Sequence, residues 1–501
     1  MHPLVFYLSM VLVFMFVVWG VVLPQNLANT ATHLLDFTIA KFGWMYLITV
    51  FSFLIFCLYL AFSEFGNIKL GSDYDKPDYS NLTWFAMLFS AGMGIGLVFW
   101  GIAEPIYHYI DPPMGIPGQT PEAGATALRY SFFHWGLHPW SIYGIIALTL
   151  AYFQFRKKTA GLVSSTFFPL LGERVKGPLG QAIDILAIIA TVFGVATSLG
   201  LGALQINGGL SHIFGVANNP TTQLMVILIV TVLYMLSANT GLNKGIKILS
   251  NLNITVAIGL LLFVLLLGPT TFIFDTFTTT LGSYLQNIIQ MSLRLTPFTQ
   301  GTWIGQWTLF YWAWWIAWAP FVGTFIARIS KGRTIREFIL GVLIAPSIFS
   351  FLWFAAFGGT ALNMEMFQNI GIAAAVQADV SSALFITLEH LPLGMIISLL
   401  ATTLIITFFI TSADSATFVL GMLSTDGSLN PTTKVKIIWG ILQSSTAMVL
   451  LLSGGLEGLQ TMAILAALPF SIIMLLMCFS IYKALREEIK PKLRKTSNRQ
   501  F

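Results

Sequence analysis

The chain concentrates tryptophan between residues 303 and 318, where six of its 14 tryptophans occur. In the segment Trp307-Thr-Leu-Phe-Tyr-Trp-Ala-Trp-Trp-Ile-Ala-Trp318, aromatic residues recur at spacings that place them on one face of a helix. Aromatic faces attract organic cations by ~0.5–2 kcal/mol each, including methylated ammonium groups that have no N–H to donate. The pattern indicates a cage for a quaternary ammonium compound, and its candidate members are Trp314, Trp315 and Trp318.

A belt of tryptophan at the membrane surface is the alternative explanation. Depth argues against a belt, because Trp314 and Trp315 lie roughly 15 Å along a membrane helix that begins near residue 305, at the bilayer midplane. Further aromatic residues, Trp135, Trp140 and Tyr143, lie in a span near residues 133–153, with the last two roughly 10–15 Å deep. Aromatic side chains from two helices are therefore expected at one level.

A glycine string, Ser90-Ala-Gly-Met-Gly-Ile-Gly96, lies within another apolar run. Each glycine inside a helix costs about 1 kcal/mol relative to alanine. Two explanations remain open: close helix packing through small residues, or an unwound segment whose backbone holds a ligand at mid-membrane. The second explanation makes Gly92, Met93, Gly94 and Gly96 candidate substrate-binding residues.

Hydroxyl side chains interrupt a later apolar run at Thr411-Ser-Ala-Asp-Ser415. Such hydroxyls usually bond to the preceding turn of their own helix. A sodium site is the alternative, because Thr411 and Ser412 lie about 12 Å from one end of their span, at nearly the depth of Ala91 and Met93.

A few titratable residues lie in or beside the apolar runs. Glu104 and Asp414 are candidate proton carriers, although Glu104 is expected to be solvated at the outer end of its span. His134 and His138 are spaced as a metal pair on one helix face. No carboxylate or cysteine partner is evident in the sequence, so a metal site is disfavoured.

The elements that carry these residues are membrane helices. Of 501 residues, 56% are hydrophobic and only 9% are charged, against about 25% charge in soluble domains. This excludes a soluble enzyme and a nucleic-acid binder. Runs long enough to cross a bilayer predict an all-α polytopic membrane protein with twelve spans: 4–24, 43–63, 84–103, 133–153, 183–205, 222–240, 251–274, 305–327, 338–358, 395–419, 434–453 and 461–483.

Charge predicts the orientation. If the N-terminus is cytoplasmic, 22 of the 25 basic residues fall on the cytoplasmic side and only Lys41, Arg129 and Arg294 fall outside. Both termini are then cytoplasmic, and the basic tail can contact membrane lipid. Residues 276–295 should form an amphipathic helix along the outer interface or against a neighbouring subunit. A shorter helix is expected over 378–390.

These motifs resemble the betaine/carnitine/choline transporter family over nearly the whole chain. The similarity includes the glycine string, the aromatic segments around Trp135 and Trp315, and Phe408-Phe-Ile-Thr-Ser-Ala-Asp-Ser415. It is greatest to Gram-positive glycine betaine uptake carriers. The resemblance implies two extra helices before a five-plus-five inverted repeat like that of sodium-coupled neurotransmitter-type carriers. The expected divisions are 1–83, 84–275 (spans 3–7), 276–304 (connecting helix), 305–483 (spans 8–12) and 484–501 (basic tail).

The resemblance also implies roles for particular residues. Trp135, Trp140, Tyr143 and Trp315 would form the central cage, with Trp314 and Trp318 on the inward path. Backbone carbonyls around Ala91, Met93 and Phe408, with the hydroxyls of Thr411 and Ser412, would bind sodium. A second sodium site is implied at Thr191, but Val195 stands where the family has a second threonine.

Two positions bear on the choice of substrate and ion within the family. The choline-specific, proton-coupled branch carries an acid at the position of Gly96, so glycine favours betaine, whose carboxylate an acid would repel. Sodium-independent carnitine exchangers lack the hydroxyl that Thr411 supplies, so Thr411 favours sodium coupling.

We therefore expect a homotrimer of the cell (cytoplasmic) membrane that imports glycine betaine with sodium by alternating access. Sodium is the coupling ion, and no other cofactor and no nucleic acid are expected. The alternatives are a choline or carnitine carrier of the same family, a channel, or an intramembrane enzyme. No His-Glu-x-x-His, paired intramembrane aspartates or Gly-x-Ser-x-Gly occurs to support the enzyme.

Overall fold

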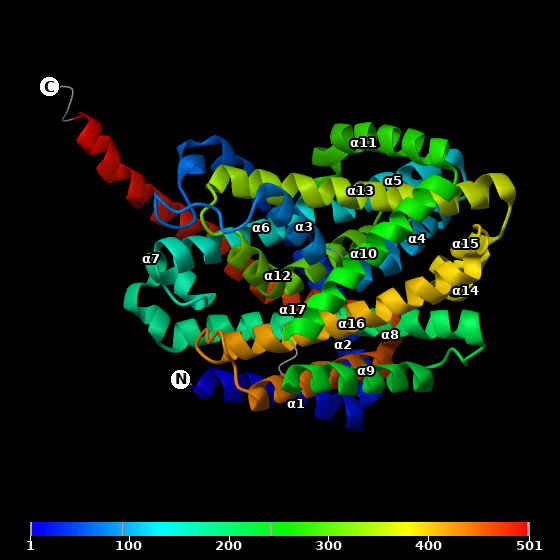
Figure 1. Cartoon of the computed structure of the whole chain (residues 1–501), viewed down its shortest axis with the longest axis horizontal. Coiled ribbons are helices and arrows are strands. Elements are labelled where there is room, and N and C mark those ends of the chain that lie inside the picture. Colours follow the sequence, from blue (N-terminus) through cyan, green and yellow to red (C-terminus); the bar gives the residue numbers. More distant parts are fainter. Residues whose placement is uncertain (1–2, 93, 241–242, 498–501) are drawn as a thin grey trace.

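The computed structural model describes the backbone of residues 3–92, 94–240 and 243–497. Side chains are described within these ranges except at residues 3, 89, 91, 92, 237–240, 243–247 and 490–497. Throughout this part the regular structure is helical, with one isolated β-bridge between Lys69 and Thr334. Most helices run along the long axis of the molecule (Figure 1), and the first described helix begins at the same end at which the last one finishes.

Eight helices in the described ranges are each long and apolar enough to cross a membrane, so the predicted all-α multi-pass architecture is confirmed. They include α1 (Pro3–Val22), α2 (Pro24–Phe62), α8 (Pro178–Phe214), α10 (Asn243–Leu267), α12 (Phe310–Ile329), α13 (Ile335–Gln368), α16 (Gly394–Ser424) and α17 (Thr433–Ser497). Helix α12 continues a π-helical turn, η6 (Gly305–Leu309).

The other four predicted spans lie in helices that are short, interrupted or merged. The span 222–240 lies in α9 (Pro220–Thr240), and the span 461–483 is the second half of α17, which changes direction at Gly455 with φ 55°. The spans 84–103 and 133–153 are each broken into two helices: α3 (Asn81–Gly92) with α4 (Ile95–Ile110), and α5 (Pro121–Trp135) with α6 (Leu137–Ala151).

The two breaks have local causes in the sequence. Between α3 and α4, Gly94 is fully extended, with φ −160° and ψ −176°. Between α5 and α6, Gly136 leaves the helical region with φ −97° and ψ −132°. Pro139 follows in the first turn of α6, and because proline has no N–H it cannot bond the carbonyl of Trp135 one turn earlier.

Three boundaries differ from the prediction. Helix α2 begins at Pro24 and not near residue 43, because proline suits the first turn of a helix and residues 25–42 contain neither glycine nor another proline. Helix α10 ends at Leu267 and not at 274, ahead of Gly268-Pro269. The connecting helix α11 therefore covers Thr270–Ser292.

Short helices fill the connections. They are η1 (Glu64–Asn67), η2 (Pro113–Gly115), the π-helical η3 (Tyr152–Arg156), η4 (Ser164–Phe167), α7 (Phe168–Leu171), η5 (Gly172–Lys176), α14 (Ile372–Ala378), η7 (Val380–Ser382) and α15 (Ala383–Glu389). The helix expected over 378–390 is thus the pair η7 and α15.

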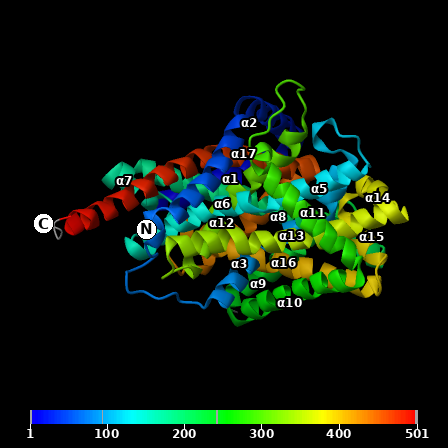
Figure 2. The same cartoon turned by 90° about the horizontal axis from the view of Figure 1, so that it is seen from above.

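A central group of helices holds the interior together. Helix α8 packs against α16, α17 and α12, and α12 also packs against α6. From above, α6, α12 and α8 lie in the middle of the molecule, with α9 and α10 along one margin (Figure 2). In the most apolar 18-residue window of the span that contains α12, 83% of the residues are buried, whereas in that of α1 only 22% are. The aromatic helix is therefore an interior helix.

Candidate functional site

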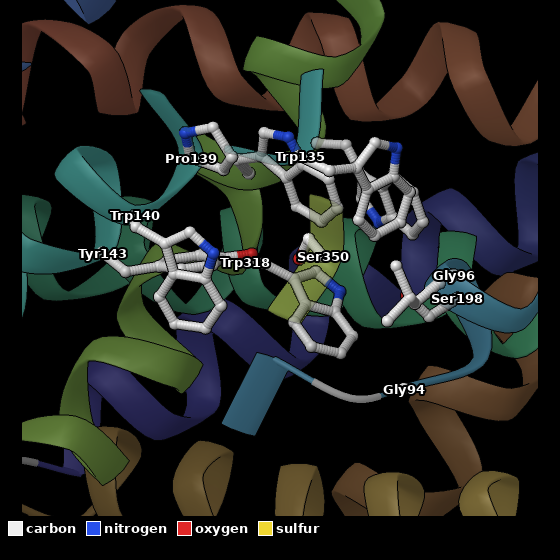
Figure 3. Close-up of a pocket in the computed structure, with 12 residues that line it drawn as sticks. Gly94, Gly96, Trp135, Pro139, Trp140, Tyr143, Ser198, Trp318 and Ser350 are labelled. Carbon is white, nitrogen blue, oxygen red and sulfur yellow. The ribbon is translucent and has the colours of Figure 1, made fainter. Parts of the chain in front are cut away.

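A pocket lies where the extended Gly94 faces α6 and α12 (Figure 3). It encloses about 490 Å³ of space that protein atoms do not occupy, part of which is open to solvent. Six helices (α4, α5, α6, α8, α12 and α13) and the α3–α4 break contribute its walls. The lining residues are Gly94, Gly96, Leu97, Trp135, Pro139, Trp140, Tyr143, Ser198, Trp314, Trp315, Trp318 and Ser350.

All six aromatic residues singled out in the sequence line this pocket. The ring centroids of Trp135 and Trp315 are 4.8 Å apart, and the ring planes meet at 75°. Trp314 stacks on Trp315 at 4.7 Å and 15°. Helix α6 supplies the edge-to-face pair Trp140 and Tyr143, at 5.6 Å. Such arrangements are the favourable ones for aromatic rings, so the walls are mutually supported.

Hydrogen bonds fix two of the indole rings of α12 by their polar edges. The Nε1–H of Trp315 donates to the carbonyl of His134 at 3.0 Å, and that of Trp318 donates to the carbonyl of Gly194 at 2.7 Å. The freed carbonyl end of α5 thus holds a ring of α12. Because protein atoms satisfy these N–H groups, the electron-rich ring faces are available to a ligand that has no acceptor to offer.

The two described glycines of the string serve different purposes. A methyl group on Gly96 would lie 2.4 Å from Cη2 of Trp314 and 3.3 Å from Cη2 of Trp135, so this position permits close packing of the rings. Nothing lies within 4 Å of the corresponding point on Gly94, which opens to the pocket. Close packing thus explains Gly96, and the helix is broken where Gly94 lines the pocket; that this backbone holds a ligand stays a prediction. Only the backbone of Gly92 is described, and Met93 lies outside the described residues.

The candidate sodium ligands can be located only in part. On α16, the Thr411 hydroxyl donates to the carbonyls of Thr407 and Phe408, at 3.0 and 3.2 Å, and accepts from the Nδ2 amide of Asn253 at 3.2 Å. Phe408 is buried, while Ser412, on the next position after Thr411, is partly exposed. The Ala91 side chain and Met93 lie outside the described residues, so the α3 half of the set is not described.

Thr191, the candidate for a second sodium site, is fully buried on α8. Its hydroxyl donates to the carbonyl of Ala187 at 2.7 Å. This is the ordinary local bond of a threonine inside a helix, and the apolar Val195 lies one turn further along.

Glu104 corrects an expectation from the sequence, because it is completely buried instead of solvated. Its Oε1 lies 2.7 Å from Nδ1 of His134 and 3.2 Å from Nε2 of His108. Its Oε2 accepts from Trp135 Nε1 at 2.8 Å and from the Tyr311 hydroxyl at 2.5 Å. Because its members come from different helices, spacing along one helix could not predict this cluster.

The histidine pair is also corrected by this cluster. His134 has a carboxylate partner, Glu104, which the sequence did not reveal, and its Nε2 lies 3.0 Å from the Thr308 hydroxyl. His138 instead has its Nε2 2.8 Å from the hydroxyl of Ser292. The two histidines therefore do not act together as a metal pair.

Sequence reasoning also missed two hydroxyl residues of the pocket, Ser198 on α8 and Ser350 on α13. Each lies in a long, largely apolar helix near another small hydroxyl residue, Thr197 next to Ser198 and Ser347 one turn before Ser350, and neither pair forms a recognised motif. Pro139 and Leu97, which complete the wall, are flanked by the aromatic and glycine motifs and were within reach of them.

Comparison with known proteins gives a consistent result. The profile of the betaine/carnitine/choline family transporters matches residues 4–490. The glycine betaine transporter OpuD of Bacillus subtilis is 57% identical over 94% of this chain and 92% of its own length. A probable glycine betaine transporter of Desulfitobacterium hafniense is 49% identical, with 97% of each chain covered. An ectoine/hydroxyectoine transporter of Virgibacillus pantothenticus is 49% identical, with 96% of each covered.

The match spans nearly the whole chain, and it agrees with the apolar helices and the aromatic pocket. Proteins of this family are transporters and not enzymes. The chain is therefore a multi-pass membrane protein that belongs to the betaine/carnitine/choline transporter family.

Proposed function

We propose that this chain imports glycine betaine by sodium-coupled symport with alternating access. The observation that carries the proposal is the pocket walled by Trp135, Trp140, Tyr143 and the tryptophans of α12. Three or four aromatic faces would contribute about 2–8 kcal/mol to binding a trimethylammonium group, which corresponds to millimolar-to-micromolar affinity. The relatives named as glycine betaine transporters support the choice of substrate.

Sodium coupling is proposed because betaine is a zwitterion. It carries no net charge, so the membrane potential alone cannot concentrate it. One sodium ion entering with each betaine would supply ~2.3 kcal/mol per 100 mV, and a tenfold sodium gradient about 1.4 kcal/mol more. The sum of ~3.7 kcal/mol supports roughly 500-fold accumulation. The proposed ligands are the oxygens of Thr411, Ser412 and Phe408 with those around Ala91 and Met93.

The remaining parts of the proposal concern the setting. The transporter would lie in the cytoplasmic membrane with both termini inside, in contact with lipid, and assemble as a homotrimer. Spans 3–7 and 8–12 would be the two inverted repeats that move against each other. The basic residues on one side of the predicted topology support this orientation.

Uptake of labelled betaine into proteoliposomes tests the substrate and the ion together. We expect saturable uptake that requires an inward sodium gradient and that exchanges with betaine loaded inside. Unlabelled choline, carnitine and ectoine are the competitors, because a relative is named as an ectoine/hydroxyectoine transporter. Strong competition by choline with weak competition by unlabelled betaine would contradict the proposed substrate. Equal uptake without sodium would contradict the proposed coupling. Flux that does not saturate would indicate a channel.

A further inference from the structure

The buried carboxylate of Glu104 stands behind the wall of the pocket and is absent from its lining. Four groups surround it: His108 from its own helix α4, His134 and Trp135 from the end of α5, and Tyr311 from α12. Three helices thus meet at one carboxylate. Of these neighbours, Trp135 is itself a pocket wall, so the carboxylate is one side chain away from a bound ligand.

A carboxylate is costly inside a membrane unless it is fully hydrogen bonded. Here each oxygen has two partners, and the bonds from Trp135 and Tyr311 to Oε2 are 2.8 and 2.5 Å long. Charge-assisted bonds of this length are roughly twice as strong as neutral ones. The glutamate, histidine and histidine together resemble the composition of a metal site, but these hydrogen bonds already satisfy both oxygens without an ion.

Trp135 differs from Trp315 and Trp318 in the group that accepts its indole N–H. The N–H groups of Trp315 and Trp318 donate to neutral backbone carbonyls, whereas that of Trp135 donates to a carboxylate. Hydrogen bonds in a chain polarise one another, so donation to an anion shifts electron density from the N–H toward the indole ring. A more negative ring face attracts a cation more strongly.

We propose that Glu104 is a positioning residue for the substrate cage, which it serves in two ways through Trp135. It fixes the Trp135 ring at a right angle to Trp315 (75°), and it makes the face of that ring more negative toward a methylated ammonium group. The inference rests on the proposed betaine function. Because the carboxylate is not in the pocket itself, it favours the ammonium end of a zwitterion without touching the substrate's own carboxylate.

The main experiment replaces Glu104 by glutamine, which keeps the size but removes the charge. We expect Glu104→Gln to raise the KM for betaine about tenfold or more, as loss of a charge-assisted bond implies, with a smaller change in maximal rate. Asp184→Asn is the matched control. Asp184 is another buried carboxylate, on α8, and it bonds the backbone and hydroxyl of Ser164 away from the pocket; its KM should stay at the wild-type value.

A double-mutant cycle shows whether Glu104 acts through the indole N–H. Phenylalanine has no N–H, so in a Trp135→Phe background the further change Glu104→Gln should alter the betaine KM by less than about twofold. An undiminished effect in that background would overturn the proposal, as would a wild-type KM for Glu104→Gln or an equal rise for Asp184→Asn.

Two further results keep the outcomes distinct. If Glu104→Gln does not reach the membrane, Tyr311→Phe is the variant that tests the proposal, because it removes one donor to Oε2 of Glu104. It should raise the KM for betaine about threefold, and an unchanged KM would refute the proposal. If wild-type protein neither binds nor transports betaine, the proposed function fails. If wild-type protein does and Glu104→Gln matches it, only the role of Glu104 fails.

Discussion

Trp315 contacts four other aromatic rings in and around the pocket. Its ring centroid lies 4.7 to 6.2 Å from the rings of Trp314, Trp135, Tyr311 and Tyr143. The ring therefore offers a face to a ligand and also holds other walls in place. Its removal should affect binding beyond the loss of one contact.

We predict that Trp315→Ala raises the apparent KM for betaine by at least tenfold. Loss of one cation–π face of up to ~2 kcal/mol corresponds to about thirtyfold, and the loosened neighbours add to it. Trp439→Ala is the control, because Trp439 is also buried but lies in a separate cluster, where its N–H donates to the Ser424 hydroxyl at 2.9 Å. Initial uptake rates over a range of betaine concentrations, normalised to protein in the vesicles, provide the measurement; wild-type affinity in Trp315→Ala would remove it from the cage.

A methyl group at Gly96 gives a second prediction at the residue scale. Because it would lie 2.4 Å from Cη2 of Trp314, Gly96→Ala must displace that ring, and we expect the Kd for betaine to rise several-fold. Gly259→Ala on α10 is the control, since nothing lies within 4 Å of the added carbon there. Betaine binding to the purified variants can be measured by calorimetry. Equal affinities for the two variants would mean that the Trp314 ring moves without cost.

At the scale of elements, the broken helices divide what the sequence could and could not predict. The glycine string allowed an unwound segment, and the structure breaks the helix at that point, before α4. The break between α5 and α6 rests on a single glycine and a proline three residues later, which the span assignment overlooked. A hydropathy run is continuous across such a break, because hydropathy records transfer to lipid and not backbone hydrogen bonding.

The same distinction explains the site. Helical spacing indicated the aromatic walls of α12, because their positions repeat along one helix, and depth in a second apolar run indicated Trp135, Trp140 and Tyr143. It missed the burial of Glu104 and its partners on α5 and α12, and it missed Ser198 and Ser350. Contacts between helices far apart in sequence leave no periodic pattern within one of them, so only packing reveals them.

The proposed sodium site depends on two elements meeting, α3 and α16, and Thr411 tests it. We predict that Thr411→Ala raises the sodium concentration for half-maximal uptake about tenfold or more, because an oxygen ligand is lost. Thr403→Ala is the matched control on the same helix; Thr403 is exposed and its hydroxyl bonds the Leu399 carbonyl at 2.8 Å. Betaine uptake is measured against sodium concentration. Overlapping curves for wild type and Thr411→Ala would exclude this ligand.

At the scale of the whole molecule, charged residues join the last helix to two connections that are far from it in sequence. Arg156, at the end of η3, donates to Glu488 of α17 at 2.6 Å and to the carbonyl of Gly71 at 2.7 Å, and pairs with Asp73 at 2.9 Å. The Tyr152 hydroxyl donates to the same glutamate at 2.7 Å. The last helix is thereby tied to two connections that the predicted topology puts on the same side of the membrane.

This topology gives the final prediction, which concerns single cysteines placed on opposite sides. Both native cysteines, Cys57 and Cys478, are replaced by alanine, and either Lys158 or Phe298, both exposed, is replaced by cysteine. The excess of basic residues on one side predicts that this side is cytoplasmic. A membrane-impermeant maleimide should therefore label Phe298→Cys in intact cells and Lys158→Cys only after permeabilisation. The reverse pattern would contradict the predicted orientation and place both termini outside the cell.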